Sequence, residues 1–319
     1  MSENNNKNYI GIDVSKLKLD VCFDDSRTSE SFSNDHDGIK KLIAKIKQYD
    51  NPHVIMEATG GYERQVHKLI ATSGIVVSIV HAGRIRYFAK SKSILEKTDQ
   101  IDAHVIRWFG KENNPPITEL RDDTMQRFSD LSKRRDQLIE HRKLELQHQE
   151  KADSKEIANS IKKVIKFIEK QINAIESSLN CLLEDERLRT KANIISSFKG
   201  CGKNAVYVLL SDLPELGEID NKPLSKLVGL APLAHDSGKF KGKRIISGGR
   251  QRTRCALYLC TLSAVQYNPQ IKALHKRLTA IGKTPKVVLI ACAHKILHVL
   301  NAMVRKGENW DPNARCITT

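Results

Sequence analysis

A long interval without glycine or proline separates the two ends of this chain. Neither residue occurs between Pro116 and Gly200, and "NNPP" at 113–116 interrupts the chain just before it. Because glycine and proline commonly end helices, the interval predicts long, uninterrupted helices. Within it, apolar residues recur at alternating spacings of four and three, the pattern of a coiled coil: Ile161, Ile165, Ile168, Ile172, Ile175, Leu179 and Leu182. With a weaker seam over 122–152, this predicts a coiled-coil helical hairpin at 116–190, used for spacing or oligomerisation.

The region before this interval, residues 1–115, alternates strand and helix patterns. "YIGIDV", "LKLDVCF" and "SESFS" predict three strands, the first two joined by a tight hairpin at Ser15 and Lys16. Two helix–strand pairs follow, in "GIKKLIAKIKQY", "HVIMEAT", "YERQVHKLIATSG" and "IVVSIVHA", and then helices from about 83 and 98. Antiparallel strands followed by alternating helices and strands are the order of a ribonuclease H-like domain, so we expect an α/β fold of that class.

Residues 191–319 predict a mainly helical domain that carries most of the positive charge. The chain has a net charge of +16, and residues 191–319 contain 21 Lys and Arg against 7 Asp and Glu, a net of +14. Such segregated charge favours a polyanionic partner, of which nucleic acid is the commonest. In "FKGCGKN", Gly200 and Gly202 resemble a helix–hairpin–helix element that could face a phosphate, although a plain tight turn explains them equally well.

The cysteine content and the hydropathy of the chain indicate where in the cell the protein lies. The seven cysteines include no C-x-x-C pair, which favours reduced thiols over a disulfide framework or a zinc ribbon. The N-terminus has no apolar signal region, and no segment approaches the roughly 20 apolar residues that span a bilayer. We therefore expect a soluble, cytoplasmic protein with no membrane partner.

Four carboxylates occupy positions that this fold would bring together. Asp13 ends the first strand and Glu57 ends the fourth, and functional groups gather at the carboxyl ends of such strands. Asp99 and Asp102, in "KTDQID", lie three residues apart on one helix face. Each acid alone has a plainer explanation, such as helix capping with Thr98. Four converging carboxylates would repel one another without a divalent cation, and oxygen ligands favour Mg²⁺ or Mn²⁺ for phosphodiester chemistry.

Two blocks of sequence resemble a known family. "YIGIDVSKLKLDV", "IMEATGGYERQV" and "KTDQIDAHVIRWF" resemble the RuvC-like DEDD domain of one group of insertion-sequence transposases, the bridge-RNA-guided recombinases related to the pilin-gene invertases. "LSKLVGLAPLAHDSGKFKGKRIISGGRQRTRCALY" resembles the serine-bearing domain of the same group. The resemblance covers nearly the whole chain. It implies catalytic, metal-binding acids at Asp13, Glu57, Asp99 and Asp102, and a nucleophilic serine at Ser237.

Ser237 is followed by a basic stretch. Residues 239–254 contain no acid, and we expect their seven cations to bind the nucleic-acid backbone: Lys239, Lys241, Lys243, Arg244, Arg250, Arg252 and Arg254. Such cations would hold a phosphate and stabilise the charge that develops during attack by a hydroxyl. A lone "SG" would ordinarily be a solvated loop, but the family motif favours the nucleophile. Neighbours in a chain rarely converge as a triad, so His235 and Asp236 are expected to shape the loop.

The resemblance implies a DNA recombinase that cuts and rejoins double-stranded donor and target DNA, both chosen by a structured guide RNA. Ser237 would form a covalent phosphoserine link, and the protein would be a homo-oligomer, a dimer of dimers held by its coiled coil. One alternative is a metal-dependent, junction-resolvase-like nuclease in which water attacks and Ser237 is incidental. Another is a basic nucleic-acid-binding protein whose acid site is inactive.

Overall fold

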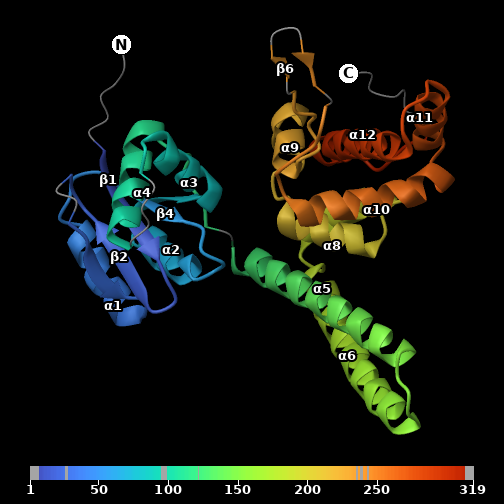
Figure 1. The fold of residues 1–319 in the computed structure, drawn as a ribbon, viewed down its shortest axis with the longest axis horizontal. Helices are drawn as coiled ribbons and strands as arrows, with labels where there is room; N and C mark the ends of the chain where they lie inside the picture. Colours follow the sequence, from blue (N-terminus) through green and yellow to red (C-terminus); the bar gives the residue numbers. More distant parts are fainter. Residues whose placement is uncertain are drawn as a thin grey trace. The chain divides into compact units, whose positions relative to one another are not determined.

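The chain folds into two compact units, Met1–Arg121 and Asp122–Thr319, each with its own hydrophobic core (Figure 1). The computed structural model describes residues 7–25, 28–94, 99–120, 122–234, 236–237, 240–242 and 244–312, without the side chains at 99–101, 240 and 241.

The first unit is a five-stranded mixed sheet with helices on both faces (Figure 1). Its strands are β1 (Asn8–Val14), β2 (Lys18–Cys22), β3 (Glu30–Ser33), β4 (Pro52–Glu57) and β5 (Val76–Val80), in the spatial order β3-β2-β1-β4-β5. The first three pair antiparallel, whereas β4 and β5 run parallel to β1. Its helices are α1 (His36–Ile46), α2 (Glu63–Thr72), α3 (Ala82–Ser91) and α4 (Asp99–Asn113). The α/β prediction is confirmed, and the sheet is consistent with a ribonuclease H-like domain.

One face of the sheet is buried against α1 and α2. Ile10 and Ile12 of β1 lie on this face, because alternate side chains of a strand point the same way. Helix α1 meets them with Ile39, Leu42 and Ile46, which the spacing of three and four residues places on one side of the helix. All five side chains are fully buried.

Helix α4 packs on the opposite face, at a point where β1 has no side chain. A Cβ added at Gly11 would overlap the carbonyl oxygen of Ala103 and the backbone nitrogen of Arg107, both in α4. Gly110, further along α4, meets the sheet in the same way, because its Cβ would lie 2.5 Å from Cγ1 of Ile55. The two glycines therefore let the helix backbone approach β1 and β4 more closely than any other residue would allow.

The chain that follows α4 stays with the first unit. The backbone N–H of Thr118 donates to the carbonyl of Val77 (2.8 Å), and its hydroxyl accepts from the backbone N–H of Ile79 (2.9 Å). This segment covers the outer edge of β5, whose backbone groups would otherwise lack partners. The break at "NNPP" thus lies inside the first unit, which ends at Arg121.

The second unit is mainly helical. Its helices are α5 (Asp123–Glu150), α6 (Lys155–Leu182), α7 (Glu186–Ser197), α8 (Lys203–Asp212), α9 (Asn221–Val228), α10 (Gln251–Tyr267), α11 (Pro269–Ala280) and α12 (Pro285–Lys306). Two short strands, β6 (Asp236–Ser237) and β7 (Phe240–Lys241), form a small hairpin between α9 and α10. Helix α12 is long and apolar enough to cross a membrane, but its buried side chains belong to the core of this unit.

Helices α5 and α6 form the long hairpin, and its base merges with the other helices. Along the hairpin, Ile168 and Ile172 of the predicted seam pack with Leu138 of α5. At the base, Phe128 and Leu179 belong to the main core of the unit. The seam is therefore used within one chain, and the hairpin shares a core with the helices that follow it.

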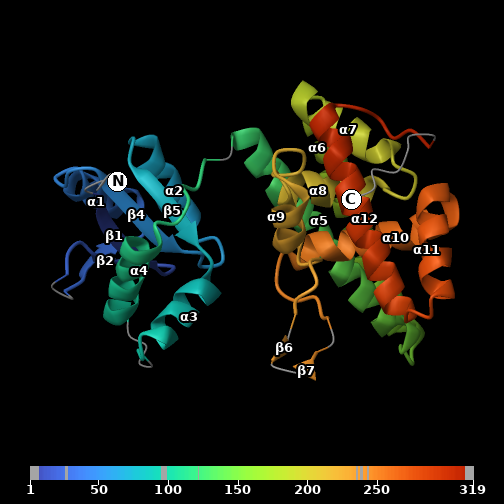
Figure 2. The ribbon, with the colours of Figure 1, turned by 90° about the horizontal axis from the view of Figure 1, so that it is seen from above.

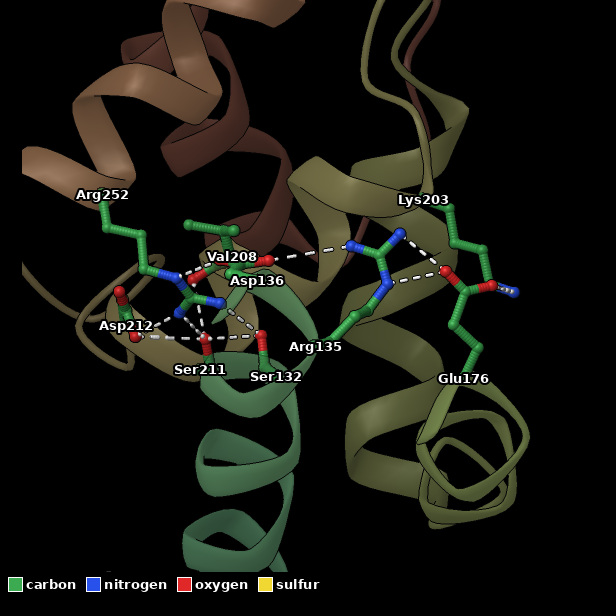
Figure 3. Close-up of polar contacts among 9 residues, drawn as sticks. All are labelled: Ser132, Arg135, Asp136, Glu176, Lys203, Val208, Ser211, Asp212 and Arg252. Atoms are coloured by element: carbon green, nitrogen blue, oxygen red, sulfur yellow. Dashed lines mark hydrogen bonds and ion pairs between the residues drawn. The ribbon is translucent and has the colours of Figure 1, made fainter. Parts of the chain in front are cut away.

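A partly buried arginine ties three helices together at this base (Figure 3). Arg252, in the first turn of α10, donates from Nε to Asp136 of α5 (2.6 Å) and from Nη1 to Asp212 of α8 (2.8 Å). It also donates to the hydroxyls of Ser132 (2.6 Å) and Ser211 (2.9 Å), both almost fully buried. Charge-assisted hydrogen bonds of this kind are roughly twice as strong as neutral ones.

A second arginine joins the two arms of the hairpin beside it (Figure 3). Arg135 of α5 donates from Nε to Glu176 of α6 (2.6 Å), and its guanidinium lies 5.5 Å from the ring centre of Tyr207 in α8. The hydroxyl of Tyr207 in turn donates to Asn180 of α6 (2.8 Å). The base of the hairpin is thus held by directional polar contacts as well as by apolar packing.

We predict that Gly11→Ala disrupts the first unit. The added methyl group would force α4 away from β1, and overpacking of this kind typically costs about 1–3 kcal/mol. The measurement is urea unfolding of the full chain. Gly202→Ala is the control, since nothing lies within 4 Å of the Cβ it adds. Equal stability of the two variants would contradict close helix–sheet packing.

We also predict that Arg252→Met destabilises the second unit by about 2–4 kcal/mol. Two partly exposed carboxylates and two buried hydroxyls would lose their shared donor, and both the unpaired charges and the unsatisfied hydroxyls cost stability. Arg244→Met should have little effect, because the pair it forms with Asp236 is solvent-exposed. Urea unfolding distinguishes the two, and a loss of the same size in both variants would argue against the buried network.

Candidate active site

Three of the four predicted acids lie at one place in the first unit. Asp13 is the penultimate residue of β1, and Glu57 is the last residue of β4. The two strands are parallel neighbours, with Ile12 paired to Met56, so both acids lie at the same carboxyl edge of the sheet. Asp102 comes from the first turn of α4.

These three acids line one cavity of about 440 Å³. Helix α3 forms another wall of it, through residues that include Gly83 and Arg86. Asp99 begins α4, but its side chain lies outside the described residues. The structure therefore brings together Asp13, Glu57 and Asp102, as the sequence predicted, and leaves the fourth acid as a prediction.

Close packing of α4 on the sheet explains why Asp102 reaches the edge. Asp102 directly precedes Ala103, whose carbonyl lies against Gly11, two residues before Asp13. A helix held further from the sheet would carry its carboxylate away from the two strand ends. The contact at Gly11 is thus part of the geometry of the acids, and the sequence motif did not reveal it.

The loop after Glu57 is held by a second glutamate. The carboxylate of Glu63 accepts from the backbone N–H groups of Thr59 (3.1 Å) and Gly61 (2.9 Å). Gly60 and Gly61 both have positive φ, at 65° and 111°, which glycine adopts without strain. The "TGG" turn thereby leads the chain from the strand end into α2, while Thr59 lines the cavity.

Another carboxylate beside the site escaped the sequence analysis. Asp20 of β2 lies opposite Asp13 in the antiparallel register and is only 3% exposed. It is engaged by Lys18 (2.8 Å) and by the hydroxyl of Ser31. These partners offset the cost of burying the charge, which indicates a supporting role for Asp20. Its place in the alternating strand pattern of β2 was the available signal.

The donor set of the cavity suits a hard divalent cation. Carboxylate oxygens are the ligands that Mg²⁺ and Mn²⁺ prefer, and the three acids face one space. Within the described part of the chain, no three acidic, histidine or cysteine side chains stand close enough to enclose an ion. The oxygen donors therefore fit a divalent ion by chemistry, and binding would require Asp99 or a small inward movement of the others.

Ser237 occupies an exposed position on the β6–β7 hairpin of the second unit. It pairs with Phe240, and in Figure 2 the two strands lie at the end of their loop that is far from α9 and α10. Nearer the base of the loop, Leu233 and Ile245 form an antiparallel bridge, in which the backbone N–H of Leu233 donates to the carbonyl of Ile245 (2.8 Å). Ser237 is thus part of a small antiparallel hairpin, and its hydroxyl-bearing side chain is exposed.

Asp236 shapes this hairpin, as expected. Its carboxylate accepts from the backbone N–H of Gly242 (3.1 Å) and from Nη1 of Arg244 (2.7 Å). The hydrogen bond from Arg244 holds the pKa of Asp236 below its usual value. His235, the other residue expected to shape the loop, lies outside the described residues.

The predicted nucleic-acid-binding cations divide into two groups. The arginines have partners inside the protein: Arg244 pairs with Asp236, Arg250 with Glu215, and Arg252 with Asp136 and Asp212, and Arg254 donates to carbonyls of Val228, Gly229 and Gly248. Lys239 and Lys243 and the side chain of Lys241 lie outside the described residues. These contacts give Arg250, Arg252 and Arg254 a structural role that the sequence analysis did not foresee. The acidic partners of Arg250 and Arg252 are distant in sequence, so the basic stretch looked unopposed.

Comparison with known proteins identifies the family. Residues 10–152 match the family model of DEDD transposases of the IS110 type, described as "Transposase". Residues 192–276 match a second model, described as "Transposase IS116/IS110/IS902 family". The first match contains the acids of the cavity, and the second contains Ser237 and the basic stretch after it.

Curated relatives agree with both matches. The chain is 28% identical to the pilin gene-inverting protein of Moraxella lacunata over 321 residues, covering 96% of this chain and 98% of the relative, and the same figures hold for Moraxella bovis. It is 27% identical over 120 residues, 37% of the chain and 30% of the relative, to an IS110 insertion-element protein of Streptomyces coelicolor. The fold, the acid cavity and these similarities together place the chain in the IS110 family of transposases, enzymes that recombine DNA.

Proposed function

We propose that this transposase cuts and rejoins donor and target DNA with Ser237 as the nucleophile and a divalent ion, Mg²⁺ or Mn²⁺, at Asp13, Glu57, Asp99 and Asp102. The observation that carries the proposal is the convergence of Asp13, Glu57 and Asp102 on one cavity. When bound, the ion would polarise the phosphate and stabilise the charge that develops on it.

The exposed position of Ser237 supports the proposed serine chemistry. The Ser237 oxygen would attack the phosphorus, forming an O–P bond as the bond from phosphorus to the sugar oxygen breaks. The serine proton must leave to a base, and the departing sugar oxygen must gain a proton. The DNA then remains joined to the protein through a phosphodiester, and attack by a second sugar hydroxyl reverses the step and frees the serine. Rejoining therefore needs no external energy source.

Recognition of DNA and of a guide RNA would fall largely to the second unit. Its excess of positive charge supports binding of a polyanion. We propose that a structured RNA selects both DNA partners, on the strength of the resemblance to the bridge-RNA-guided group. The Moraxella relatives are named for inverting a pilin gene, which is a rearrangement of DNA. We place the enzyme in the cytoplasm, where its DNA lies.

We also propose a homo-oligomer, a dimer of dimers. Because α5 of the same chain covers the isoleucine seam of α6, subunit contacts would use the outer face of the hairpin. Apolar side chains are available there, including Phe167 (62% exposed) and Ile157 (53% exposed). Such an assembly could bring the acids of one subunit to the serine of another.

A metal-dependent nuclease in which water attacks is the second candidate. The acid cavity favours it, because the described residues that line the cavity all belong to the first unit, so the acids could bind an ion and activate water without the serine. The two candidates share the acids and differ in the fate of Ser237.

We predict a covalent protein–DNA product that depends on Ser237. The full chain is incubated with Mg²⁺, the RNA transcribed from the flanking noncoding DNA, and labelled DNA carrying the element's junction. Denaturing electrophoresis should then show a labelled adduct, which Ser237→Ala abolishes. Ser247→Ala, an exposed serine of the same loop, is the matched control and should keep the adduct. Full cleavage by Ser237→Ala would overturn the serine mechanism in favour of water.

We predict that Asp13→Asn and Asp102→Asn each lower the cleavage rate at least about 100-fold, because losing a ligand weakens stabilisation of the transition-state charge. EDTA should abolish cleavage, and added Mg²⁺ should restore it. Asp37→Asn, an exposed acid on α1, serves as the control. Recombination in cells that is unchanged by both variants would instead support a binding protein with an inactive acid site.

A further inference from the structure

One exposed stripe of α3 borders the acid cavity. Gly83 and Arg86 line the cavity, and Arg86, Tyr87 and Lys90 are exposed. Spacings of three and four residues place these positions on one side of the helix, next to the buried Ile85 and Ala89, which also line the cavity. A basic and aromatic surface therefore leads away from the carboxylates.

Arg86 differs from the cations around it. Arg84 lies over the ring of Phe109, 5.2 Å from its centre. Lys92 pairs with Glu112 (2.8 Å) and lies 4.8 Å from the ring centre of Trp108. Within the described part of the chain, Arg86 makes no hydrogen bond, ion pair or ring contact. Arg86 therefore lines the cavity and contacts none of the described side chains through a hydrogen bond, ion pair or ring.

The arrangement favours an anionic ligand for Arg86 over a structural pairing. Arg107 of the same unit, by comparison, binds the carboxylate of Asp25. Arg86 shares its cavity with three carboxylates and forms an ion pair with none of them. The guanidinium is a rigid fork that matches two phosphate oxygens, so a phosphate entering the cavity would give Arg86 the partner it lacks.

Tyr87 and Lys90 extend the same surface. Tyr87 is 76% exposed, a large fraction for an aromatic side chain. A single exposed tyrosine is unremarkable, but an aromatic ring beside unpaired cations is the combination that binds single nucleic-acid strands, by stacking on bases and by charge. A DNA strand fits this chemistry better than a protein partner does, since the chain is a DNA recombinase.

We propose that Arg86 contacts the reacting phosphate of the DNA strand that lies in the acid cavity. Tyr87 and Lys90 would contact the neighbouring nucleotides of that strand along α3. The proposal rests on the proposed role of the acids in strand cleavage. It adds to that site a positively charged residue outside the DEDD set, and it assigns α3 as the path by which the strand enters.

A binding experiment tests the phosphate contact without cleavage. A labelled single-stranded DNA oligonucleotide is titrated with the full chain in Ca²⁺ over a series of salt concentrations. Arg86→Ala should reduce the slope of log K against log salt by about 0.7, the loss of one single-strand phosphate contact. Arg84→Ala, two residues away on the other side of the helix, should keep the wild-type slope. An unchanged slope in Arg86→Ala overturns the proposal.

A cleavage experiment locates the contact at the reacting phosphate. Arg86→Ala should cleave the junction DNA about 100-fold more slowly than Arg84→Ala, and Arg86→Lys should recover part of the rate. On DNA with a neutral methylphosphonate at the cleaved position, the penalty of Arg86→Ala should largely disappear, because the charge that Arg86 contacts is gone. A penalty of equal size on both substrates would show that Arg86 acts elsewhere.

These experiments distinguish failure of the Arg86 contact from failure of the proposed function. If Ser237→Ala still cleaves while Arg86→Ala is slow, the serine mechanism fails and the phosphate contact stands. If Asp13→Asn and Ser237→Ala abolish cleavage while Arg86→Ala cleaves like the wild type, the contact at Arg86 fails and the acids and serine stand. Thermal unfolding should be alike for Arg86→Ala and wild type, since Arg86 is exposed and has no described partner.

Discussion

The acid cavity depends on how closely helix α4 lies against strand β1. Gly11 has no side chain, so the backbone of α4 rests on the strand, and Asp102 reaches the edge where Asp13 and Glu57 end their strands. Catalytic geometry of this kind must be held to within roughly 0.5 Å. The absence of a side chain at position 11 is therefore as much a part of the site as the carboxylates are, and the buried apolar residues on both faces of the sheet hold the helix in place.

In the second unit, charge is used inside the protein as well as on its surface. Arg252 links α10 to α5 and α8, and Arg250 binds Glu215, so the end of the serine-bearing loop is fixed to the base of the long hairpin. Ser237 itself is exposed on a short two-stranded hairpin of that loop. The proposed nucleophile thus lies on an exposed hairpin whose loop has an anchored base. In a strongly basic chain, a stretch of arginines can serve structure first and leave phosphate binding to other cations.

The sequence predicted the elements of the first unit well, because their signals are local. The alternating pattern of β1 and β2 and the helical spacing of Ile39, Leu42 and Ile46 reflect burial on one face, which periodicity records directly. The heptad seam likewise predicted the long helix α6. Periodicity did not tell which helix would cover the seam, and the answer, α5 of the same chain, required the packed hairpin. It also could not show that Arg252 meets Asp136 and Asp212, because those contacts join residues far apart along the chain.

By itself, the sequence determined the α/β class of the first unit and the helical character of the second, and it nominated four acids for the site, since these follow from local pattern and motif. Tertiary structure alone decided which of these groups meet: three acids and Arg86 around one cavity, Asp20 held beside Asp13, and the arginines after Ser237 bound within the protein. The physical reason is that hydrophobic periodicity records which face of an element is buried. Distances between charged groups, and hence their chemistry, are fixed only when helices and strands from distant parts of the chain pack together.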